Sequence, residues 1–387
     1  MAAVINTAMN WGESIVWRRV AGISLTSWSF VFAWLAAFIG LLWDGAWHAS
    51  WGRDTFFIPP HDLMYGGVTI GLIMAIGVLV TASRRPRDAG YVHIGPLQAP
   101  LGIWIILVGL AVMFSSAAYD DWWHTNIGHI EGDPVLWSPP HFVGLIGAIT
   151  ALNGALLFML REIYVPTRAD GKPVWFWEAL DAPNVALLLM FTSLAFLLSA
   201  VSLDRFIIYD KLRFDGSLYP ILAMLFGPAA LTMGQRITNR AGSATFAIVV
   251  GFVLAGGMAF LLKNFLGYPK AASLPIMALV SAVLLDLAFK RFGRGYKWLV
   301  LMGPIFVLTF YVSEYLWAWY LTRYPWWPIE KTLVMVPLGV VVGTCSLLVG
   351  AWIAERFERA GWVKHYALKP RVSSNSNART ALDSASG

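Results

Sequence analysis

The sequence predicts an all-α, polytopic integral membrane protein, a bundle of about ten transmembrane helices. Hydrophobic residues make up 58% of the chain and charged residues only 13%, with a mean hydropathy of +0.64. A water-soluble globule does not have this composition. Apolar runs of about 20 residues, each enough to cross a bilayer core of roughly 30 Å, recur along the whole chain. They lie near residues 26–46, 62–82, 98–118, 142–160, 183–203, 217–235, 244–262, 272–289, 298–320 and 332–354.

The distribution of basic residues predicts the orientation of these spans. With the N-terminus in the cytoplasm, the inner segments and the C-terminal tail hold 20 of the 28 Lys and Arg residues. Loops on the cytoplasmic side carry such an excess in membrane proteins. An even number of spans then leaves both termini in the cytoplasm, in a multi-pass protein of the cell inner membrane. The net charge of +6 therefore reflects topology and anionic lipid, and it does not indicate a nucleic-acid partner.

No segment between the spans is long enough to form a soluble domain. Residues 1–371 are therefore expected to form a single transmembrane domain. The tail 372–387 is polar and rich in small residues, which is typical of disorder. The single cysteine, Cys345, lies inside the last apolar run, which excludes a disulfide framework and a Cys-based metal site.

A repeat unit of helix, outer loop, Pro-Pro-His and helix occurs twice, over residues 26–82 and 98–160. "WDGAWHASWGRDTFFIPPH" ends at His61, and "YDDWWHTNIGHIEGDPVLWSPPH" ends at His141. The later outer loops keep acidic residues and prolines but contain no histidine. These two segments are therefore expected to be duplicated helix hairpins.

Each hairpin places metal-binding residue types at its outer junction. Asp44 and His48 are four residues apart, so on a helix they share one face. His61 follows a Pro-Pro pair, which fixes the start of the next helix. Two ligands from one helix end and a third from the next helix suit copper, iron or zinc with an open coordination position.

The second junction repeats this order with Asp120, His124 and His141. His129, in the middle of the loop, is either an additional ligand or a solvated loop residue. Helix-terminal Asp–His pairs also form simple hydrogen bonds at a membrane interface without any metal. The same residue order at two junctions favours two metal sites, both toward the periplasmic or outer face.

The spacing D-x3-H-x12-H of Asp44, His48 and His61 resembles the metal motif of the C subunit of copper membrane monooxygenases, the particulate methane and ammonia monooxygenases. That family has a second, neighbouring site with Asn, x3, His and a further His. Here Asp120 stands at the Asn position, and the last spacing is x16. The resemblance covers residues 26–160. It implies a copper site that activates O2 to hydroxylate a small apolar substrate, together with additional membrane or periplasmic subunits.

Two residues in the later spans carry separate expectations. Glu314 lies in the outer half of its span, where it is either a catalytic proton relay or metal-site partner, or a hydrogen-bonding partner of a neighbouring helix. Asp286 and Lys290 are four residues apart and are expected to form an interfacial ion pair.

Three functions fit these patterns. The chain is a copper-dependent membrane oxidase or monooxygenase, or the metal-bearing subunit of one. Alternatively, it is a periplasm-facing metal transporter or a copper-insertion factor for a respiratory enzyme, or a scaffold whose metal only stabilises the fold. A transporter is expected to carry more acidic or histidine residues through the middle of its spans. The sequence has few beyond Glu314, which favours the enzyme.

Overall fold

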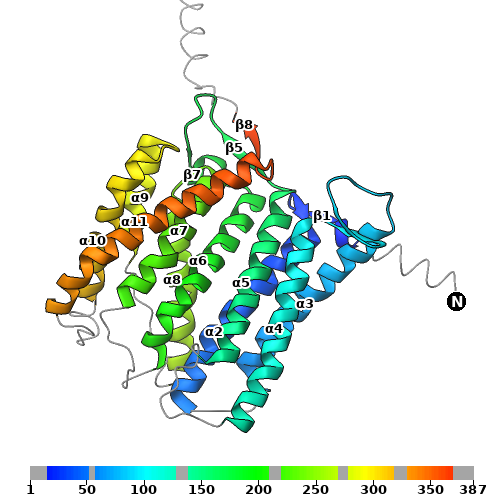
Figure 1. The fold of residues 1–387 in the computed structure, drawn as a ribbon, viewed down its shortest axis with the longest axis horizontal. Coiled ribbons are helices and arrows are strands. Elements are labelled where there is room, and N and C mark those ends of the chain that lie inside the picture. The colour runs from blue at the N-terminus through cyan, green and yellow to red at the C-terminus, as the bar shows by residue number, and fades with distance from the viewer. Residues whose placement is uncertain are drawn as a thin grey trace, which may run out of the picture.

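A computed structural model describes residues 15–51, 57–127, 138–208, 219–268, 278–317 and 329–368, and ten long helices lie within them (Figure 1). Each helix coincides with one of the apolar runs. The helices are α2 (Leu25–Trp51), α3 (Pro59–Ser83), α4 (Leu101–Asn126), α5 (Pro139–Leu160), α6 (Ala182–Ile208), α7 (Tyr219–Thr238), α8 (Ser243–Phe265), α9 (Leu279–Phe292), α10 (Lys297–Trp317) and α11 (Ile329–Arg359).

The chain is a helical membrane protein by the length and composition of its helices. Among the described residues, six helices are long and apolar enough to cross a membrane: α2, α3, α4, α5, α8 and α11. Helices α6 and α10 add shorter apolar stretches, Ala182–Ala195 and Lys297–Ser313. Large apolar side chains cover their outward faces, for example Ile73 on α3, Val253 on α8 and Leu301 on α10. Such surfaces are stable against lipid and unstable in water.

Eight short strands, paired in twos, lie in the described segments that connect or flank the helices. The antiparallel pairs are β1 (Arg19–Val20) with β2 (Ile23–Ser24) and β3 (Val92–Ile94) with β4 (Leu97–Ala99). The parallel pairs are β5 (Tyr164–Thr167) with β8 (Lys364–Ala367) and β6 (Val174–Trp175) with β7 (Arg240–Ala241). A 3-10 helix, η2 (Phe176–Ala179), follows β6.

These strands gather at one end of the bundle, which we call the strand end. The Glu162 carboxylate accepts hydrogen bonds from the Ser24 backbone N–H and the Ser27 hydroxyl, both at 2.9 Å. Lys290 Nζ donates to the Pro173 carbonyl at 2.7 Å, and Lys364 Nζ donates to the Arg161 carbonyl at 2.6 Å. These bonds join connections that are far apart in the sequence. The helices therefore run alternately toward and away from the strand end.

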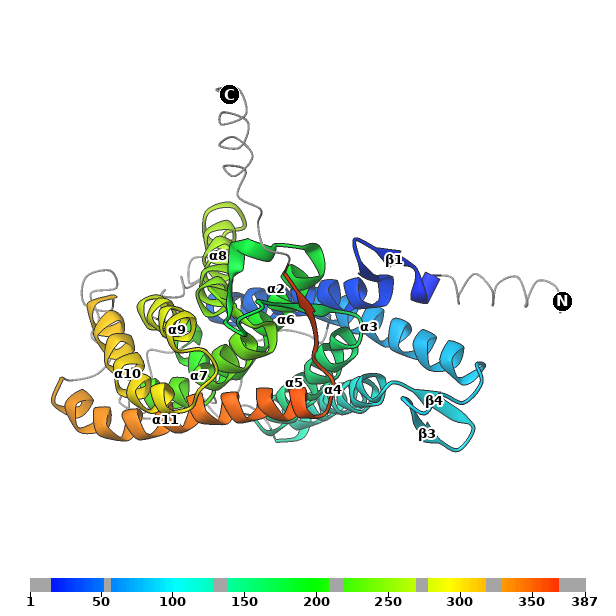
Figure 2. The same cartoon turned by 90° about the horizontal axis from the view of Figure 1, so that it is seen from above.

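Two large hydrophobic cores and two smaller clusters lie in the described part of the bundle. The first joins α2, α3, α4, α5 and α6 around fully buried residues such as Leu152 and Met159. The second joins α7, α9, α10 and α11 around Phe289, Phe306 and Leu347. Helix α8 packs on α2, α6, α7 and α9, and so bridges the two cores. Figure 2 shows α9, α10 and α11 on one side and the α2–α5 group on the other.

Glycines bring α4 and α5 into backbone contact. A Cβ at Gly109 would lie 2.4 Å from the Ala151 N atom, and a Cβ at Gly147 would lie 2.8 Å from the Gly109 O atom. Gly102 and Gly154 make the same kind of contact seven residues further toward the strand end. Close approach through small residues is a principal source of helix association in lipid, where burial from water cannot drive it.

Asp286 has a different role from the predicted ion pair with Lys290. Its carboxylate, 3% exposed, accepts hydrogen bonds from the Thr245 N–H and hydroxyl at 2.8 and 2.7 Å, and from Gln235 Nε2 at 2.7 Å. Thr245 lies in the first turn of α8, whose N–H groups have no partner inside the helix. Asp286 on α9 therefore caps the N-terminus of α8. Lys290 instead donates a hydrogen bond to the Pro173 carbonyl.

The α4–α5 contact yields a stability prediction. Gly147→Val should lower the free energy of unfolding by about 1–3 kcal/mol because the added carbons collide with the backbone of α4. Gly66→Val is the matched control, because a Cβ at Gly66 meets nothing within 4 Å. Thermal unfolding of both variants in detergent micelles, followed by tryptophan fluorescence, checks the difference. Equal midpoints for the two variants would contradict the close contact.

Candidate metal centre

The first junction lies at the end of the bundle opposite the strand end, where α2 and α3 meet. Gly40 on α2 makes this meeting close: a Cβ there would lie 2.9 Å from the Pro60 O atom and 2.4 Å from Met64 Cγ. Pro59 and Pro60 form the first turn of α3, where their missing N–H groups cost no helical hydrogen bond. Gly40 is one helical turn before Asp44, so the contact brings the start of α3 to the face that carries Asp44.

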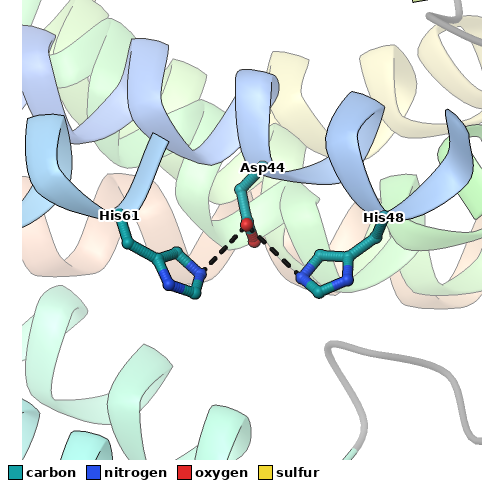
Figure 3. A group of neighbouring side chains, drawn as sticks. All are labelled: Asp44, His48 and His61. Atoms are coloured by element: carbon teal, nitrogen blue, oxygen red, sulfur yellow. Dashed lines mark ion pairs between the residues drawn. The ribbon is translucent and has the colours of Figure 1, made fainter. Parts of the chain in front are cut away.

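Asp44, His48 and His61 come together at this junction, as the sequence predicts (Figure 3). The Asp44 Oδ1 atom lies 3.0 Å from His61 Nε2 and 3.4 Å from His48 Nε2. The carboxylate lies between the two imidazole rings, whose centroids are 6.5 Å apart. Asp44 is only 6% exposed, and both histidines are half-buried.

This arrangement fits a metal ion by its donor atoms and spacing. One ligand atom from each of the three residues lies within 4.8 Å of the others. Atoms bound to one ion at about 2.0–2.2 Å lie roughly 3–4 Å from one another, so a small adjustment completes a three-ligand site. Two imidazoles and one carboxylate, without sulfur, suit zinc, copper or iron and leave coordination positions open. Without an ion, protonated histidines at the same positions form ion pairs with Asp44.

Aromatic side chains hold the other side of α2 in place. The Trp43 indole N–H donates to the Tyr268 hydroxyl at 2.9 Å, and the Trp47 and Trp51 rings each lie 6.0 Å from the Tyr268 ring. Tyr268 follows the end of α8 and is 5% exposed. Since Trp43 and Trp47 directly precede Asp44 and His48, the end of α8 fixes the helical turns that carry two of the three candidate ligands.

The second junction brings together Asp120 and His141. His141 Nδ1 lies 3.5 Å from Asp120 Oδ1 and 2.5 Å from the Ser138 hydroxyl oxygen. Both side chains are 29% exposed, so this pair is more open to its surroundings than the first group. Ser138 directly precedes Pro139, where the first junction has the apolar Ile58. The two junctions therefore share the Asp–His contact but differ in the group that holds the histidine.

The remaining predicted site residues have no described side chains. His124 lies in α4 four residues after Asp120, but the structure describes only its backbone. His129 lies in 128–137, which is outside the described residues. Glu314 belongs to α10, which packs mainly against α9 and α11, and its side chain is likewise not described. Their roles at the site stay predictions.

Sequence reasoning did not identify the small residues that shape the two junctions. Gly40 lies one turn before Asp44, and Ser116 lies one turn before Asp120. A Cβ at Gly144 would lie 2.7 Å from the Ser116 hydroxyl oxygen, so the second junction is also tightly packed. The sequence feature that could have identified them is a small residue four positions before each aspartate, on the same helix face as the aspartate and histidine.

A small apolar cavity of about 20 Å³ lies between the two hairpins, deeper in the bundle than the carboxylates. Ala37, on its wall, precedes Asp44 by seven residues, which is about 10 Å along the helix. This volume is enough for a molecule of about the size of water or O2. All four helices of the hairpins line it: Phe30, Ala33, Trp34, Ala37, Val68, Gly71, Ile106, Leu110, Ala151 and Ala155.

The comparisons with known proteins identify no relative. No protein-family model, curated protein or solved structure matches the chain. The resemblance of residues 26–160 to the copper membrane monooxygenases therefore rests on the metal-motif residues alone.

The packing at Gly40 makes a prediction about metal affinity. Gly40→Val should push the start of α3 away from α2, separate His61 from Asp44, and weaken metal binding at this site by about tenfold or more. Competition with a chromophoric chelator measures the affinity, and Gly66→Val on the open face of α3 is the control. Gly40→Ala is a milder second variant if the valine protein does not fold. Unchanged affinity in a folded Gly40 variant would contradict this positioning role.

Proposed function

We propose that the chain is the metal-bearing membrane subunit of a copper-dependent oxidase or monooxygenase, or the whole enzyme, which activates O2 to hydroxylate a small apolar substrate. The observation that carries this proposal is the convergence of Asp44, His48 and His61 where two apolar helices meet. Ionisable residues in apolar helices are costly and commonly serve function.

The chemistry of the three residues suits this role. Asp44 supplies a negative charge that offsets the charge of the ion, and His48 and His61 supply neutral nitrogen ligands. The half-buried position limits access of water while it leaves coordination positions open for O2. Lipid-facing helices give a small apolar substrate a direct route from the bilayer, and the apolar cavity is large enough to hold O2.

The proposed metal is copper because the D-x3-H-x12-H spacing is that of the copper membrane monooxygenases. Two histidines and one carboxylate are also the ligand set of non-haem iron oxygenases, and zinc accepts the same donors. Iron and zinc are therefore the alternatives that metal analysis must distinguish. Asp120, His124 and His141 are proposed as a second site, with His129 as an additional ligand and Glu314 as a proton relay.

A metal transporter or a copper-insertion factor is the second candidate, because the same three residues could receive an ion from the periplasm. A transport path requires polar groups through the middle of the bundle. The described walls of the cavity that lies inward of the site are apolar. Asp286, a buried carboxylate of the second core, is already bound by the N-terminus of α8. Both observations favour the oxidase over the transporter.

We further propose ten spans, with the strand end in the cytoplasm and the metal centre at the periplasmic face of the inner membrane. An excess of basic residues marks the cytoplasmic side. The strand end and its adjacent helix termini carry most of the described basic residues: Arg18, Arg19, Arg84, Arg85, Arg87, Arg161, Arg168, Lys172, Arg236, Arg240, Lys290, Arg291, Arg294, Lys297, Arg356, Arg359 and Lys364.

Matching contacts support a duplicated hairpin. A Cβ at Gly67 would lie 2.7 Å from the Ala33 O atom, and a Cβ at Gly147 would lie 2.8 Å from the Gly109 O atom. Gly67 and Gly147 each stand six residues after the histidine of their Pro-Pro-His, and Ala33 and Gly109 each stand eleven residues before their aspartate. The two hairpins therefore make a close backbone contact at the same positions.

Elemental analysis and EPR on protein purified in native-like lipid test the function. The wild type should hold one or two coppers, and His48→Ala or His61→Ala should each remove about one equivalent because three ligands are needed. His124→Ala should remove the other equivalent if the second site is filled. His93→Ala is the control, because His93 lies in a strand-end hairpin. O2 uptake with small hydrocarbons and ammonia then tests the chemistry.

The outcomes separate the candidates. Finding iron or zinc in the wild type would show that copper is not the metal. Full metal retention in both His48→Ala and His61→Ala would reject the first site. Metal binding without substrate-dependent O2 uptake, joined to metal transfer across vesicles, would support the transporter.

Cysteine labelling tests the orientation. In a Cys345→Ser background, a membrane-impermeant maleimide should label Phe57→Cys from the periplasmic side of spheroplasts, because Phe57 is 73% exposed beside the metal centre. His93→Cys, exposed at the strand end, should react only after the membrane is opened. The reverse pattern would invert the topology.

A further inference from the structure

The connection between α3 and α4 forms a small hairpin whose two faces differ in polarity. Strands β3 and β4 pair so that Val92 faces Ala99, His93 faces Gln98 and Ile94 faces Leu97. Side chains alternate between faces along a strand, and directly paired residues share a face. Val92, Ile94, Leu97 and Ala99 therefore lie on one face, and His93 and Gln98 lie on the other.

The polar face fixes the hairpin to the bundle. Gln98, 3% exposed, donates hydrogen bonds from Nε2 to the carbonyls of Ala82 and Arg85 at 2.9 and 2.8 Å. Its backbone N–H donates to the Ser83 hydroxyl at 2.9 Å. Gln98 thus ties the hairpin to the last turn of α3 and to the segment that follows it. From α4, the Trp104 indole N–H donates to the Val92 carbonyl at 3.1 Å. The hairpin is therefore a fixed part of the fold.

The apolar face points outward. Val92, Ile94 and Leu97 are 36%, 55% and 39% exposed, and Ala99 alone on this face is fully buried. Figure 2 shows the hairpin at the outer edge of the bundle, beside α3 and α4. Three outward apolar side chains on a rigid turn would be unfavourable in water.

Basic residues lie in the segment that the polar face of the hairpin binds. Arg84, Arg85 and Arg87 follow the end of α3 and are exposed, and Asp88 is the one acidic side chain between residues 84 and 100. The Asp88 carboxylate already accepts a hydrogen bond from the Gly90 N–H at 2.7 Å. The helices on either side of the hairpin continue the apolar surface with Val80, 38% exposed, and Leu101, 39% exposed. Both belong to membrane-spanning helices.

We infer that the β3–β4 hairpin is an interfacial anchor: Val92, Ile94 and Leu97 enter the boundary between lipid headgroups and acyl chains, and Arg84 and Arg87 bind phosphate groups of anionic phospholipids. The hairpin joins two spanning helices directly, so it lies at the level where headgroups meet water. Apolar residues on one face and basic residues on the other are typical of segments that lie at anionic membrane surfaces. Three side chains are too small a surface for a stable protein interface, which requires about 1,000 Å² or more.

Spin labelling of the full chain tests this anchor. Nitroxides on Ile94→Cys and His93→Cys, each in a Cys345→Ser background, are placed in nanodiscs with and without anionic phospholipid. The label at residue 94 should be more accessible to O2 than to a water-soluble nickel chelate, because its face lies in lipid. The label at residue 93, on the opposite face of the same strand, is the matched control and should show the reverse. In the wild type, the preference of the residue-94 label for O2 over the chelate should be stronger in anionic discs than in zwitterionic discs. The double variant Arg84→Gln/Arg87→Gln should remove this difference.

Three results would overturn the anchor. The first is equal access of the chelate to residues 93 and 94, which would place the apolar face in water. The second is protection of residue 94 from both reagents with spin–spin broadening, which would indicate a contact between two copies of the chain. The third is an unchanged residue-94 signal in the double arginine variant, which would remove anionic lipid from the proposal. None of these readouts depends on metal or on the proposed oxidase activity.

Discussion

Backbone-to-backbone contact between paired helices is the interaction on which the rest of the structure depends. Lipid offers helices no gain from leaving water, so the pairs form through close packing at small residues. Gly40 and Gly67 serve α2 and α3, while Gly109 and Gly147 serve α4 and α5. The distance between paired helices in turn determines how near His61 comes to Asp44. The candidate metal centre is thus a consequence of helix packing as much as of its ligands.

The sequence predicted those features that depend on local spacing. Apolar runs placed the helices to within several residues, and Pro-Pro placed the starts of α3 and α5. The four-residue spacing of Asp44 and His48 predicted their shared face, and the repeated order predicted the approach of His61 and of His141 to their aspartates. Six of the helices meet the length and composition of membrane spans.

Features that depend on distant contacts could not be predicted in this way. The spacing of Asp286 and Lys290 suggested a local pair, yet the carboxylate caps α8, whose start lies about 40 residues earlier. The role of Gln98 at the end of α3 and the role of Tyr268 behind the metal centre also require knowledge of which elements meet. Local spacing carries no information about such partners.

The parallel pairing of β5 with β8 has a consequence for how the protein is made. Thr167 contacts His365, and Lys364 contacts the Arg161 carbonyl, across sequence separations of 198 and 203 residues. Synthesis proceeds from the N-terminus, so the hairpins that carry the metal centre emerge long before β8. The strand end of these hairpins is therefore completed only after α11 has emerged. A chain that ends before β8 therefore lacks this closure and leaves the edge of β5 without its partner strand.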